Sequence, residues 1–405
     1  MDKGGRIRTY HMLKELKREH HVTYLALDDG NAAPDARERS REYCHDLITI
    51  THHTRPKFSV GFYLELLRNL FTPLPYFIMK YRSELMRSEI ERVANTGRYD
   101  IGVCDFLQPS VNLPDRLPFP IILFQHNVEA MIWKRHYEVQ SDALKRIYLY
   151  GQWRKAVAFE KKICRRVDCV VAVSAKDVET MRREYQVERI AEVPTGVDTD
   201  YFQPSRAAHP IPDSLVFTGS MDWLPNHDAV KFFVVEILPL IKEQLPQVKL
   251  TVVGRNPYPE LLAMAERDNA INVTGRVEDV RPFIEEATAY IVPIRIGGGT
   301  RLKIYEAMAM EKPVVSTTVG AEGLPLRDGL ELLLADSTTD FARAVVTVLK
   351  NASIANELAR NAAKLMHEQF SWQRSAAAFA EICRQTTAIE ASSSLRNKES
   401  LHAVS

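Results

Sequence analysis

Between residues 214 and 318, short apolar runs alternate with longer stretches whose apolar residues recur at helical spacing. The runs are SLVFTG, KLTVVG, INVTG, AYIVPI and PVVSTT, and several of them end in glycine. Strands that are apolar throughout are covered on both faces, and strands that alternate with helices form parallel sheets. This half of the chain is therefore predicted to be a doubly wound α/β domain.

The first half has the same alternation in a less regular form. Its apolar runs are HVTYLAL (21–27), DIGVCDF (100–106), PIILFQHN (120–127) and DCVVAVS (168–174), with long helical patterns between them. We therefore expect two α/β domains, with a seam in the segment 192–214, which is rich in Pro, Asp, Thr and Ser.

The expected boundaries follow from this seam and from the end of the chain. The predicted parts are an N-terminal domain at 1–195, a C-terminal domain at 196–370, a helix at 371–390 that can return to the first domain, and a disordered tail at 391–405. The opening MDKGGRIRTYHMLKEL resembles a glycine-rich turn that leads into a helix. Such a turn normally follows a strand, so we expect the first strand of this domain to be missing.

Composition excludes several classes of function. The chain has 405 residues, a net charge of +1, 45% apolar and 26% charged residues, so no overall field favours nucleic acid. Its five scattered cysteines form no CxxC pair, which indicates reduced thiols in a cytoplasmic protein and no zinc site. No signal peptide or membrane span is evident.

The segment 58–81 is the nearest approach to a membrane-binding sequence. It mixes aromatic, leucine and basic residues, but Glu65, Arg68 and two prolines interrupt it. Two alternatives stay open: a helix that packs on its own domain, or an amphipathic surface that contacts the inner face of a membrane peripherally.

The stretch IRIGGGTRLKIYEAMA (294–309) carries the clearest chemistry. Its glycines let the backbone approach a ligand, and Thr300 can cap a helix whose first amides then face an anion. Arg301 and Lys303 add positive charge suited to a phosphate or diphosphate, and the Glu306 carboxylate can accept hydrogen bonds from paired hydroxyls. The pattern is not GxxxxGK[ST], and no GxGxxG follows a strand, so P-loop and nicotinamide-binding domains are disfavoured.

Several ordered motifs together resemble glycosyltransferase family 4, which has the GT-B fold. They are DKGGRIRTYHMLKEL, FQHNVE, VPTGVDTDYF, TGSMDWLPNHDAVKFF, VTGRVEDVRPFIEEATAYIVPIRIGGGTRLKIYEAMAMEKPVVSTTVGAEGL and FSW. The resemblance extends from Asp2 to about Cys383. It implies two Rossmann-like domains facing across a cleft and transfer of a sugar, with retention, from a nucleotide-diphosphate sugar without a metal.

The resemblance also assigns roles and shows two departures. It implies that Glu306 holds the donor ribose and that His126 lies near the donor sugar. The family often has a second glutamate eight residues before the first, where this chain has Gly298. The family also places Arg and Lys after the first strand of the second domain, where the loop 220–226 has no cation.

We hypothesise that Arg301 and Lys303 supply the missing charge from the neighbouring loop, because the leaving diphosphate needs positive charge where negative charge develops. His126, Arg301 and Lys303 are thus the expected catalytic residues. The expected donor-binding residues are Gly4, Gly5, Gly219, Arg255, Val277, Gly298, Gly299, Thr300, Glu306 and Glu322. For several of these, a turn, cap or surface role is the alternative, and for the whole site the alternative is lost catalysis.

The favoured function is a cytoplasmic glycosyltransferase that needs no cofactor or metal and has a nucleotide sugar as donor and a glycan or lipid-linked acceptor. A GT-B-type epimerase or phosphorylase is one alternative, and a non-catalytic protein that binds a sugar nucleotide is another. No nucleic-acid partner is expected. The donor base, the sugar and the linkage are not predicted.

Overall fold

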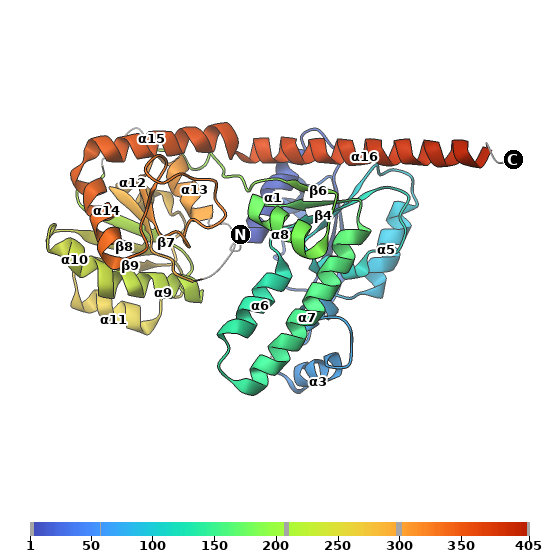
Figure 1. The fold of residues 1–405 in the computed structure, drawn as a ribbon, viewed down its shortest axis with the longest axis horizontal. Coiled ribbons are helices and arrows are strands. Elements are labelled where there is room, and N and C mark those ends of the chain that lie inside the picture. Colours follow the sequence, from blue (N-terminus) through green and yellow to red (C-terminus); the bar gives the residue numbers. More distant parts are fainter. Residues whose placement is uncertain (1–3, 57, 206–209, 297–301, 403–405) are drawn as a thin grey trace. The chain divides into compact units, whose positions relative to one another are not determined.

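The computed structural model describes residues 4–56, 58–205, 210–296 and 302–402. It divides into two compact units: unit 1 comprises Met1–Pro194 and Ser375–Ser405, and unit 2 comprises Thr195–Arg374. Each unit contains parallel sheet and covering helices (Figure 1). The predicted pair of α/β domains is therefore confirmed.

The strands of unit 1 form two parallel sheets, one of β1 and β2 and the other in the order β3-β4-β5-β6. Their bounds are β1 Thr23–Asp28, β2 Asp46–Thr51, β3 Gly102–Asp105, β4 Ile121–Gln125, β5 Cys169–Ala172 and β6 Ile190–Glu192. The helices are α1 Gly4–Leu16, α2 Ala36–Arg39, η1 Ser40–Glu42, α3 Val60–Asn69, α4 Tyr76–Met79, α5 Glu84–Ala94, η2 Gln108–Asn112, α6 Glu129–Val139, α7 Ala143–Arg166, α8 Ala175–Tyr185 and, from Ser375 on, α16 Trp372–His402.

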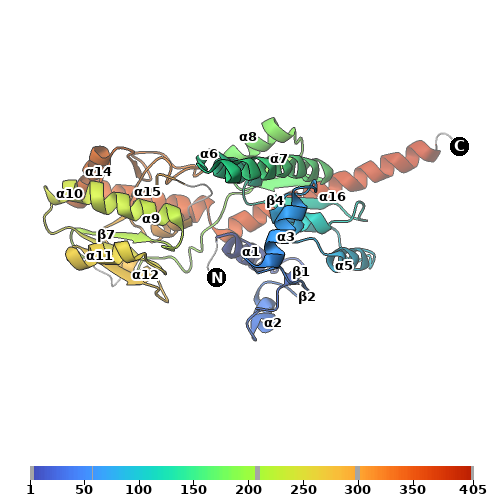
Figure 2. The same cartoon turned by 90° about the horizontal axis from the view of Figure 1, so that it is seen from below.

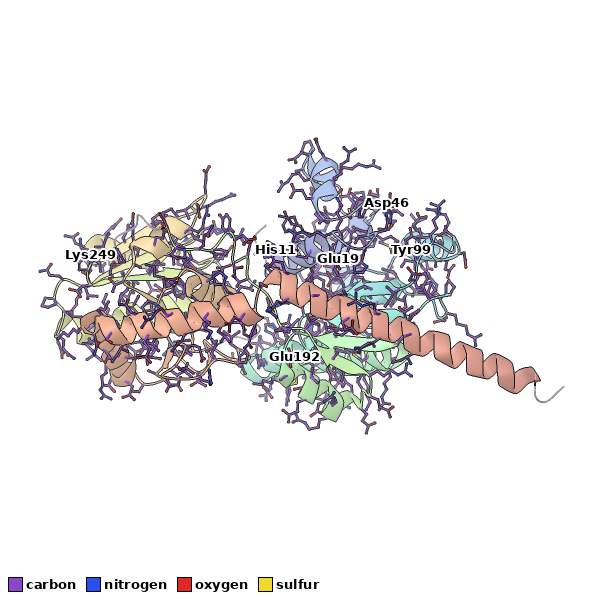
Figure 3. All side chains as sticks on the ribbon, turned by 90° about the horizontal axis from the view of Figure 1, so that it is seen from above. His11, Glu19, Asp46, Tyr99, Glu192 and Lys249 are labelled. Carbon is purple, nitrogen blue, oxygen red and sulfur yellow. The ribbon has the colours of Figure 1, made fainter. Side chains whose placement is uncertain are left out.

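Within the described part of the chain, α1 is the first element and leads into β1. The start of β1 lies near the start of β3, because the Tyr99 hydroxyl donates a hydrogen bond to Thr23 Oγ1 at 3.2 Å. Asp46, the β2 partner of Thr23, and Tyr99 are seen near the same end of unit 1 in Figure 3. The two sheets of unit 1 are therefore neighbours, although no backbone pairing joins them among the described residues.

Successive residues of β4 point to opposite faces of its sheet, as strand geometry requires. Leu123 joins the buried cluster formed with α7 and α8, which includes Phe159 and Met181. Phe124 packs instead on Phe379 of α16, with ring centroids 5.1 Å apart. Figure 1 accordingly shows β4 and β6 between α16 and the α6–α7 pair. The last helix therefore supplies the second cover of this sheet, and it continues through most of the segment for which the sequence predicts disorder.

Unit 2 contains one parallel sheet in the order β12-β11-β10-β7-β8-β9. The strands are β7 Ser214–Thr218, β8 Lys249–Val253, β9 Ile271–Gly275, β10 Ala289–Val292, β11 Val314–Ser316 and β12 Leu333–Leu334. The helices are α9 Leu224–Phe232, η3 Phe233–Ile237, α10 Leu238–Lys242, α11 Pro259–Arg267, α12 Arg281–Glu286, α13 Leu302–Ala309, α14 Thr338–Lys350 and α15 Ala352–Gln369.

The apolar runs of the sequence account for this sheet. Every residue of β10 and β11 is buried, which requires helices on both faces of the sheet. The helical segment from Leu224 to Lys242 is irregular, because α9 passes into a π-helical turn, η3, before α10. Pro239 lies just after this turn and has no N–H to donate to the preceding turn, which is the physical reason for the irregularity.

No helix within the described ranges has the length and apolar character needed to cross a lipid bilayer.

Packing of α16 on unit 1 can be tested with Phe379→Ala, because Phe379 is only 2% exposed. Loss of a buried aromatic ring is expected to lower the free energy of unfolding of unit 1 by about 3–5 kcal/mol. Ile389→Ala, in the same helix at 46% exposure, is the control and should cost less than about 1 kcal/mol. Chemical denaturation of both variants measures the difference, and equal effects would contradict the packing.

Candidate functional site

The strand order of unit 2 reverses between β7 and β10. From β7 the chain moves outward through β8 and β9, and it then returns to the other side of β7 with β10. In a parallel sheet, the crevice at the carboxyl ends of the strands on either side of such a reversal binds ligands. The segments that follow β7 and β10, at 219–223 and 293–296, therefore meet at the switch point of this sheet.

Lys303, at the start of α13, extends to the loop that follows β7. Its Nζ donates a hydrogen bond to Asn226 Oδ1 at 2.9 Å and lies 4.1 Å from the centroid of the Phe217 ring. The Asn226 amide in turn donates to the Ser220 carbonyl oxygen at 2.9 Å. The loop 220–226 contains no cationic residue, so this contact brings a positive charge to it from the neighbouring strand end.

Two glycines make the close approach of these segments feasible. A Cβ at Gly219 would lie 2.6 Å from Lys303 Nζ and 2.6 Å from Asn226 Nδ2. A Cβ at Gly254 would overlap the carbonyl oxygen of Gly219, at 1.8 Å. Any side chain at either position would displace the amine or the backbone, so both strand ends require glycine.

Arg255 brings a second cation to the same loop from the end of β8. Its Nε donates to Ser220 Oγ at 2.7 Å and lies 3.8 Å from Asp222 Oδ2. The backbone completes the link, because Met221 N donates to the Arg255 carbonyl oxygen at 2.9 Å. The guanidinium is thus fixed beside the switch point, next to Asp222.

Glu306 lies one turn into α13, beyond Lys303. Burial raises the pKa of its carboxyl to about 7, and the Lys303 ammonium partly opposes this rise. Burial with a nearby Glu306 charge also raises the pKa of Tyr290, whose hydroxyl is hydrogen-bonded to Thr218 at the end of β7. A carboxyl placed in this way is suited to paired hydroxyl donors, which would replace the lost water.

Unit 1 carries a second polar cluster at the carboxyl ends of β3 and β4. The Arg8 guanidinium donates to His126 Nδ1 at 2.8 Å, and His126 Nε2 lies 2.5 Å from Asp105 Oδ1. Thr9 Oγ1 donates to the other carboxylate oxygen of Asp105, also at 2.5 Å. Because arginine can only donate, Nδ1 of His126 is the acceptor and Nε2 carries the proton.

The Asp105 carboxylate is the accessible member of this cluster. The side chain of Asp105 is 21% exposed, whereas that of His126 is 1% exposed and both of its ring nitrogens are hydrogen-bonded. Burial lowers the pKa of His126, and burial also lowers the pKa of Arg8 to about 10 despite the nearby Asp105 charge. The Asp105 carboxylate is therefore accessible to solvent, and the neutral imidazole of His126 and the hydroxyl of Thr9 hold it in place.

The backbone beside the cluster is strained. Phe106 follows Asp105 with a φ of 69°, a conformation that costs a bulky residue energy, and its ring stacks on His126 with centroids 3.9 Å apart. A Cβ at Gly5 would lie 2.7 Å from this ring, so the start of α1 approaches the cluster closely only because Gly5 has no side chain.

Glu160 of α7 holds the segment that follows His126. Its carboxylate accepts hydrogen bonds from the backbone N–H groups of Glu129 and Ala130, each at 2.9 Å, and from Tyr185 and Gln125. Burial raises the pKa of Glu160 to about 7. An acid from another helix therefore satisfies the free amides at the start of α6 and fixes the end of β4.

Two family descriptions match successive parts of the chain. "Glycosyltransferase Family 4" matches residues 3–201 and "Glycosyl transferases group 1" matches residues 212–351. The first match contains the Asp105 and His126 cluster, and the second contains Lys303 and Glu306. The chain belongs to glycosyltransferase family 4. The family resemblance of the sequence and the assignment as an enzyme are thereby confirmed.

The glycosyltransferase is similar to several curated proteins. An uncharacterized 44.6 kDa protein of the cps region of Klebsiella pneumoniae is 22% identical, over 76% of this chain and 79% of that protein. A lipopolysaccharide core biosynthesis mannosyltransferase of Rhizobium leguminosarum is 24% identical, over 59% of this chain and 70% of its own length. The chain spans 65% of the trehalose synthase of Thermococcus litoralis, at 23% identity.

Solved structures support the same fold. Sucrose-phosphate synthase from Thermosynechococcus elongatus has a TM-score of 0.69 at 19% identity, over 96% of this chain and 94% of that chain. Anabaena HepE, solved in complex with UDP, has a TM-score of 0.65 at 13% identity, over 95% and 96% of the two chains. These likenesses confirm the GT-B fold of the glycosyltransferase.

The structure groups some of the predicted site residues and separates others within unit 2. Lys303, Glu306, Gly219 and Arg255 meet at the switch point of the glycosyltransferase. Val277 lies farther along, after β9, and packs its side chain partly on the core. Four predicted residues lie outside the described residues: Gly298, Gly299, Thr300 and Arg301.

Glu322 lies in the loop after β11, and β11 is the neighbour of β10 in the sheet. Thr317 joins the two segments, because its hydroxyl donates to the Ile294 carbonyl oxygen and accepts from Gly320 N at 2.9 Å. The predicted residues of unit 1 form a separate group. His126 and Gly5 belong to the Asp105 cluster, and Gly4 begins α1.

Sequence reasoning missed Asp105 and Asn226, and it did not foresee the contact of Arg8 with His126. Asp105 lies near the end of an apolar run, as His126 does, and an acid at the end of a predicted strand was an available signal. Arg8 lies 118 residues from His126 in the chain, and its burial depends on contacts that no local pattern contains. Asn226 is a neutral residue at the start of α9, so a pattern of charges in the sequence does not indicate it.

No group of three or more His, Cys, Asp or Glu side chains in the described ranges is arranged to hold a metal ion.

Glu306→Gln tests the electrostatic state of the donor-side carboxyl without ligand. Because burial raises the pKa of the folded carboxyl, the wild type loses stability as the pH rises from about 4.5 to about 7, and the amide does not. The variant should therefore be more stable than the wild type by about 1–3 kcal/mol at pH 8 and similar to it at pH 4.5. Denaturation at several pH values measures this.

Glu357→Gln, on the exposed side of α15, is the control for this experiment and should show no such pH-dependent gain. A Glu306→Gln protein that is no more stable than the wild type at pH 8 would contradict the raised pKa of Glu306.

Proposed function

We propose that this glycosyltransferase moves a sugar from a nucleotide-diphosphate sugar to a glycan or lipid-linked acceptor with retention of the anomeric configuration. The observation that carries the proposal is the position of Lys303 Nζ at the loop after β7, 2.9 Å from Asn226 Oδ1. Negative charge builds on the diphosphate as the sugar leaves, and a fixed cation stabilises that charge. Lys303 thus supplies the charge that loop 220–226 lacks.

Neighbouring residues extend this donor site. Arg255, held at Ser220 Oγ, adds a second cation, and Arg301 adds a third in the proposal. Gly219 leaves room for the diphosphate and for Lys303, while Glu306 accepts hydrogen bonds from the two ribose hydroxyls. Glu322 lies after β11 in the loop that Thr317 ties to β10, and in the proposal it contacts the transferred sugar in place of the acid missing at Gly298.

The names of related proteins support a nucleotide-sugar donor and a lipid-linked acceptor. HepE has been solved with UDP-glucose, and two groups of relatives are named as mannosyltransferases that act on phosphatidyl-myo-inositol or in lipopolysaccharide core biosynthesis. A lipid-linked acceptor also suits a protein that contacts the inner face of a membrane peripherally through 58–81. We propose both for this chain, with the donor base left open.

The unit 1 cluster would serve the acceptor side. His126 and Thr9 hold the Asp105 carboxylate, which then accepts a hydrogen bond from an acceptor hydroxyl and orients its oxygen. The leaving phosphate takes the proton from that hydroxyl as the new glycosidic bond forms, so no further protein base is required. His126 then acts as a positioning residue rather than by direct contact with substrate.

Donor binding is tested by thermal shift with UDP-, GDP-, ADP- and CMP-sugars on the wild type, Glu306→Ala and Lys303→Ala. We expect one nucleotide class to raise Tm, and both variants to lose most of the rise because they lack the ribose or diphosphate contact. Lys303→Ala should also lower kcat/KM by about 10²–10³-fold. Lys231→Ala, which removes an exposed lysine paired with Glu260, is the control.

The outcomes separate the functions. Unchanged donor affinity and turnover in Lys303→Ala and in Arg301→Ala plus Lys303→Ala would contradict the relocated cations. A Tm rise without turnover for any glycan or lipid-linked acceptor would favour the non-catalytic binding protein. Interconversion of the free sugar nucleotide would favour an epimerase, which needs acid and base groups at the sugar.

Asp105→Asn tests the acceptor role. Loss of a hydrogen bond to a charged group is expected to lower kcat/KM for the acceptor by about 10–100-fold while donor affinity stays within about twofold. The change should leave Tm close to that of the wild type, because the amide still fits between His126 and Thr9. Asp46→Asn, at an exposed surface pair with His21, is the control. Unaltered acceptor kinetics would contradict this role.

A further inference from the structure

Helix α3 of unit 1 is turned with its apolar face outward. Five apolar side chains of α3 and of the turn after it are between 51% and 87% exposed and recur at spacings of three and four residues. They are Val60, Tyr63, Leu64, Leu67 and Phe71. Phe58 and Leu70 extend the same surface, at 79% and 49% exposed. We refer to these seven residues as the α3 patch. An apolar surface of this size on one short helix is unusual for a protein surrounded by water.

The opposite face of α3 contains polar groups that are fully used within unit 1. Asn69 is 0% exposed, and its side chain contacts the Leu74 carbonyl oxygen and Gln152 of α7. Glu65 accepts from the Tyr76 hydroxyl at 3.1 Å and from Arg55 at 3.2 Å. The rotation of α3 about its axis is therefore fixed by hydrogen bonds, and the exposure of the α3 patch is built into the fold.

The start of α7 adds a second apolar surface beside the first. Leu144, Ile147 and Tyr150 are 81%, 70% and 46% exposed, at successive spacings of three residues. Lys155, farther along α7, donates to the Asn69 carbonyl oxygen at 2.6 Å, so α3 and α7 are joined directly. Figure 1 and Figure 2 both show α3 beside α7, and Figure 1 shows the α6–α7 pair ending at its own exposed turn.

Basic residues surround these apolar side chains. Arg55 and Arg68 are exposed near α3, and Lys145 and Arg146 are exposed at the start of α7. Within 58–81 the only acidic residue is Glu65, which pairs with Arg55 and the Tyr76 hydroxyl. At the start of α7 the only acidic residue is Asp142, whose carboxylate caps the helix by accepting from Lys145 N. The chain as a whole has a net charge of only +1, so this surface is locally cationic.

We propose that the α3 patch and the start of α7 together form a docking surface for an anionic lipid membrane. Aromatic and aliphatic side chains enter the boundary between headgroups and acyl chains, while the surrounding cations contact lipid phosphates. Charge decides against a second copy as the occupant, because two such surfaces would bring Arg68, Lys145 and Arg146 of each chain together, whereas Arg55 is already paired with Glu65. The inference deepens the proposed function, since it places a lipid-linked acceptor next to the unit that carries Asp105.

Sedimentation with vesicles tests the surface on the full chain. Vesicles of phosphatidylcholine alone and of phosphatidylcholine with phosphatidylglycerol are compared over a range of salt concentrations. The wild type should bind the anionic vesicles at low salt, lose binding as salt rises, and bind neutral vesicles about tenfold or more weakly. Absence of binding to anionic vesicles at low salt would overturn the proposal.

Matched variants assign the binding to this surface. Leu64→Gln plus Leu67→Gln should weaken binding by about tenfold or more, whereas Val235→Gln plus Leu262→Gln, at exposed apolar sites of unit 2, should leave it unchanged. Lys145→Gln plus Arg146→Gln should weaken it by roughly fivefold per charge. Lys350→Gln plus Arg360→Gln removes the same charge elsewhere and should have at most a small effect.

The remaining outcomes are also decisive. Equal loss in the surface and control variants would overturn the assignment to α3 and α7. A dimer that becomes a monomer in Leu64→Gln plus Leu67→Gln, without any vesicle binding by the wild type, would show that a second copy covers the patch instead. The donor-induced Tm rise, unchanged in each variant, shows that the fold is intact. Vesicle binding by a chain with no donor shift would refute the proposed function alone.

Discussion

The pairing of β10 with β7 is the constraint on which the donor side of this glycosyltransferase depends. These strands are separated in the chain by β8, β9 and the helices α9 to α12, yet they are neighbours in the sheet. Their pairing brings α13, which follows β10, to the loop after β7 and places Lys303 at Asn226. Without this reversal of strand order, the cation and the loop that lacks cations would lie at unrelated strand ends.

The two units hold their carboxylates in different ways. Asp105 has partners for both oxygens, and Glu160 is satisfied by backbone N–H groups and side chains. Glu306 is buried beside Lys303, and its raised pKa shows that this one cation does not offset the loss of water. A carboxyl that is costly in the free protein gains the most from hydroxyl donors brought by a ligand. Glu306 is therefore the acid of the site whose energetics most directly favour a ligand.

The sequence predicted well what depends on local patterns. The buried strands β10 and β11 were evident as apolar runs, and α13 was evident as a helix that follows a glycine-rich stretch. Contacts between distant segments were beyond its reach. Arg8 and His126 meet across 118 residues, and only the packed unit shows that His126 uses both nitrogens inside the protein. A sequence shows directly that loop 220–226 has no cationic residue, so the hypothesis that Lys303 supplies its charge could be made. The sequence does not show that Asn226 is the hydrogen-bond partner of Lys303.

Departures from the rules of local structure gather where a ligand or a surface partner would act. Phe106 adopts a φ of 69° beside Asp105, Glu306 is desolvated, and α3 turns its leucines to solvent and Asn69 to the interior. Each feature lowers the stability of the folded chain, and none improves the packing of a core. Hydrogen bonds on the inward face of α3 oppose any rotation of the helix, because Asn69 would lose its contacts with Leu74 and Gln152. Hydrogen bonds of Asn69 thus hold α3 in an orientation that exposes its apolar side chains, which suits contact with a medium less polar than water.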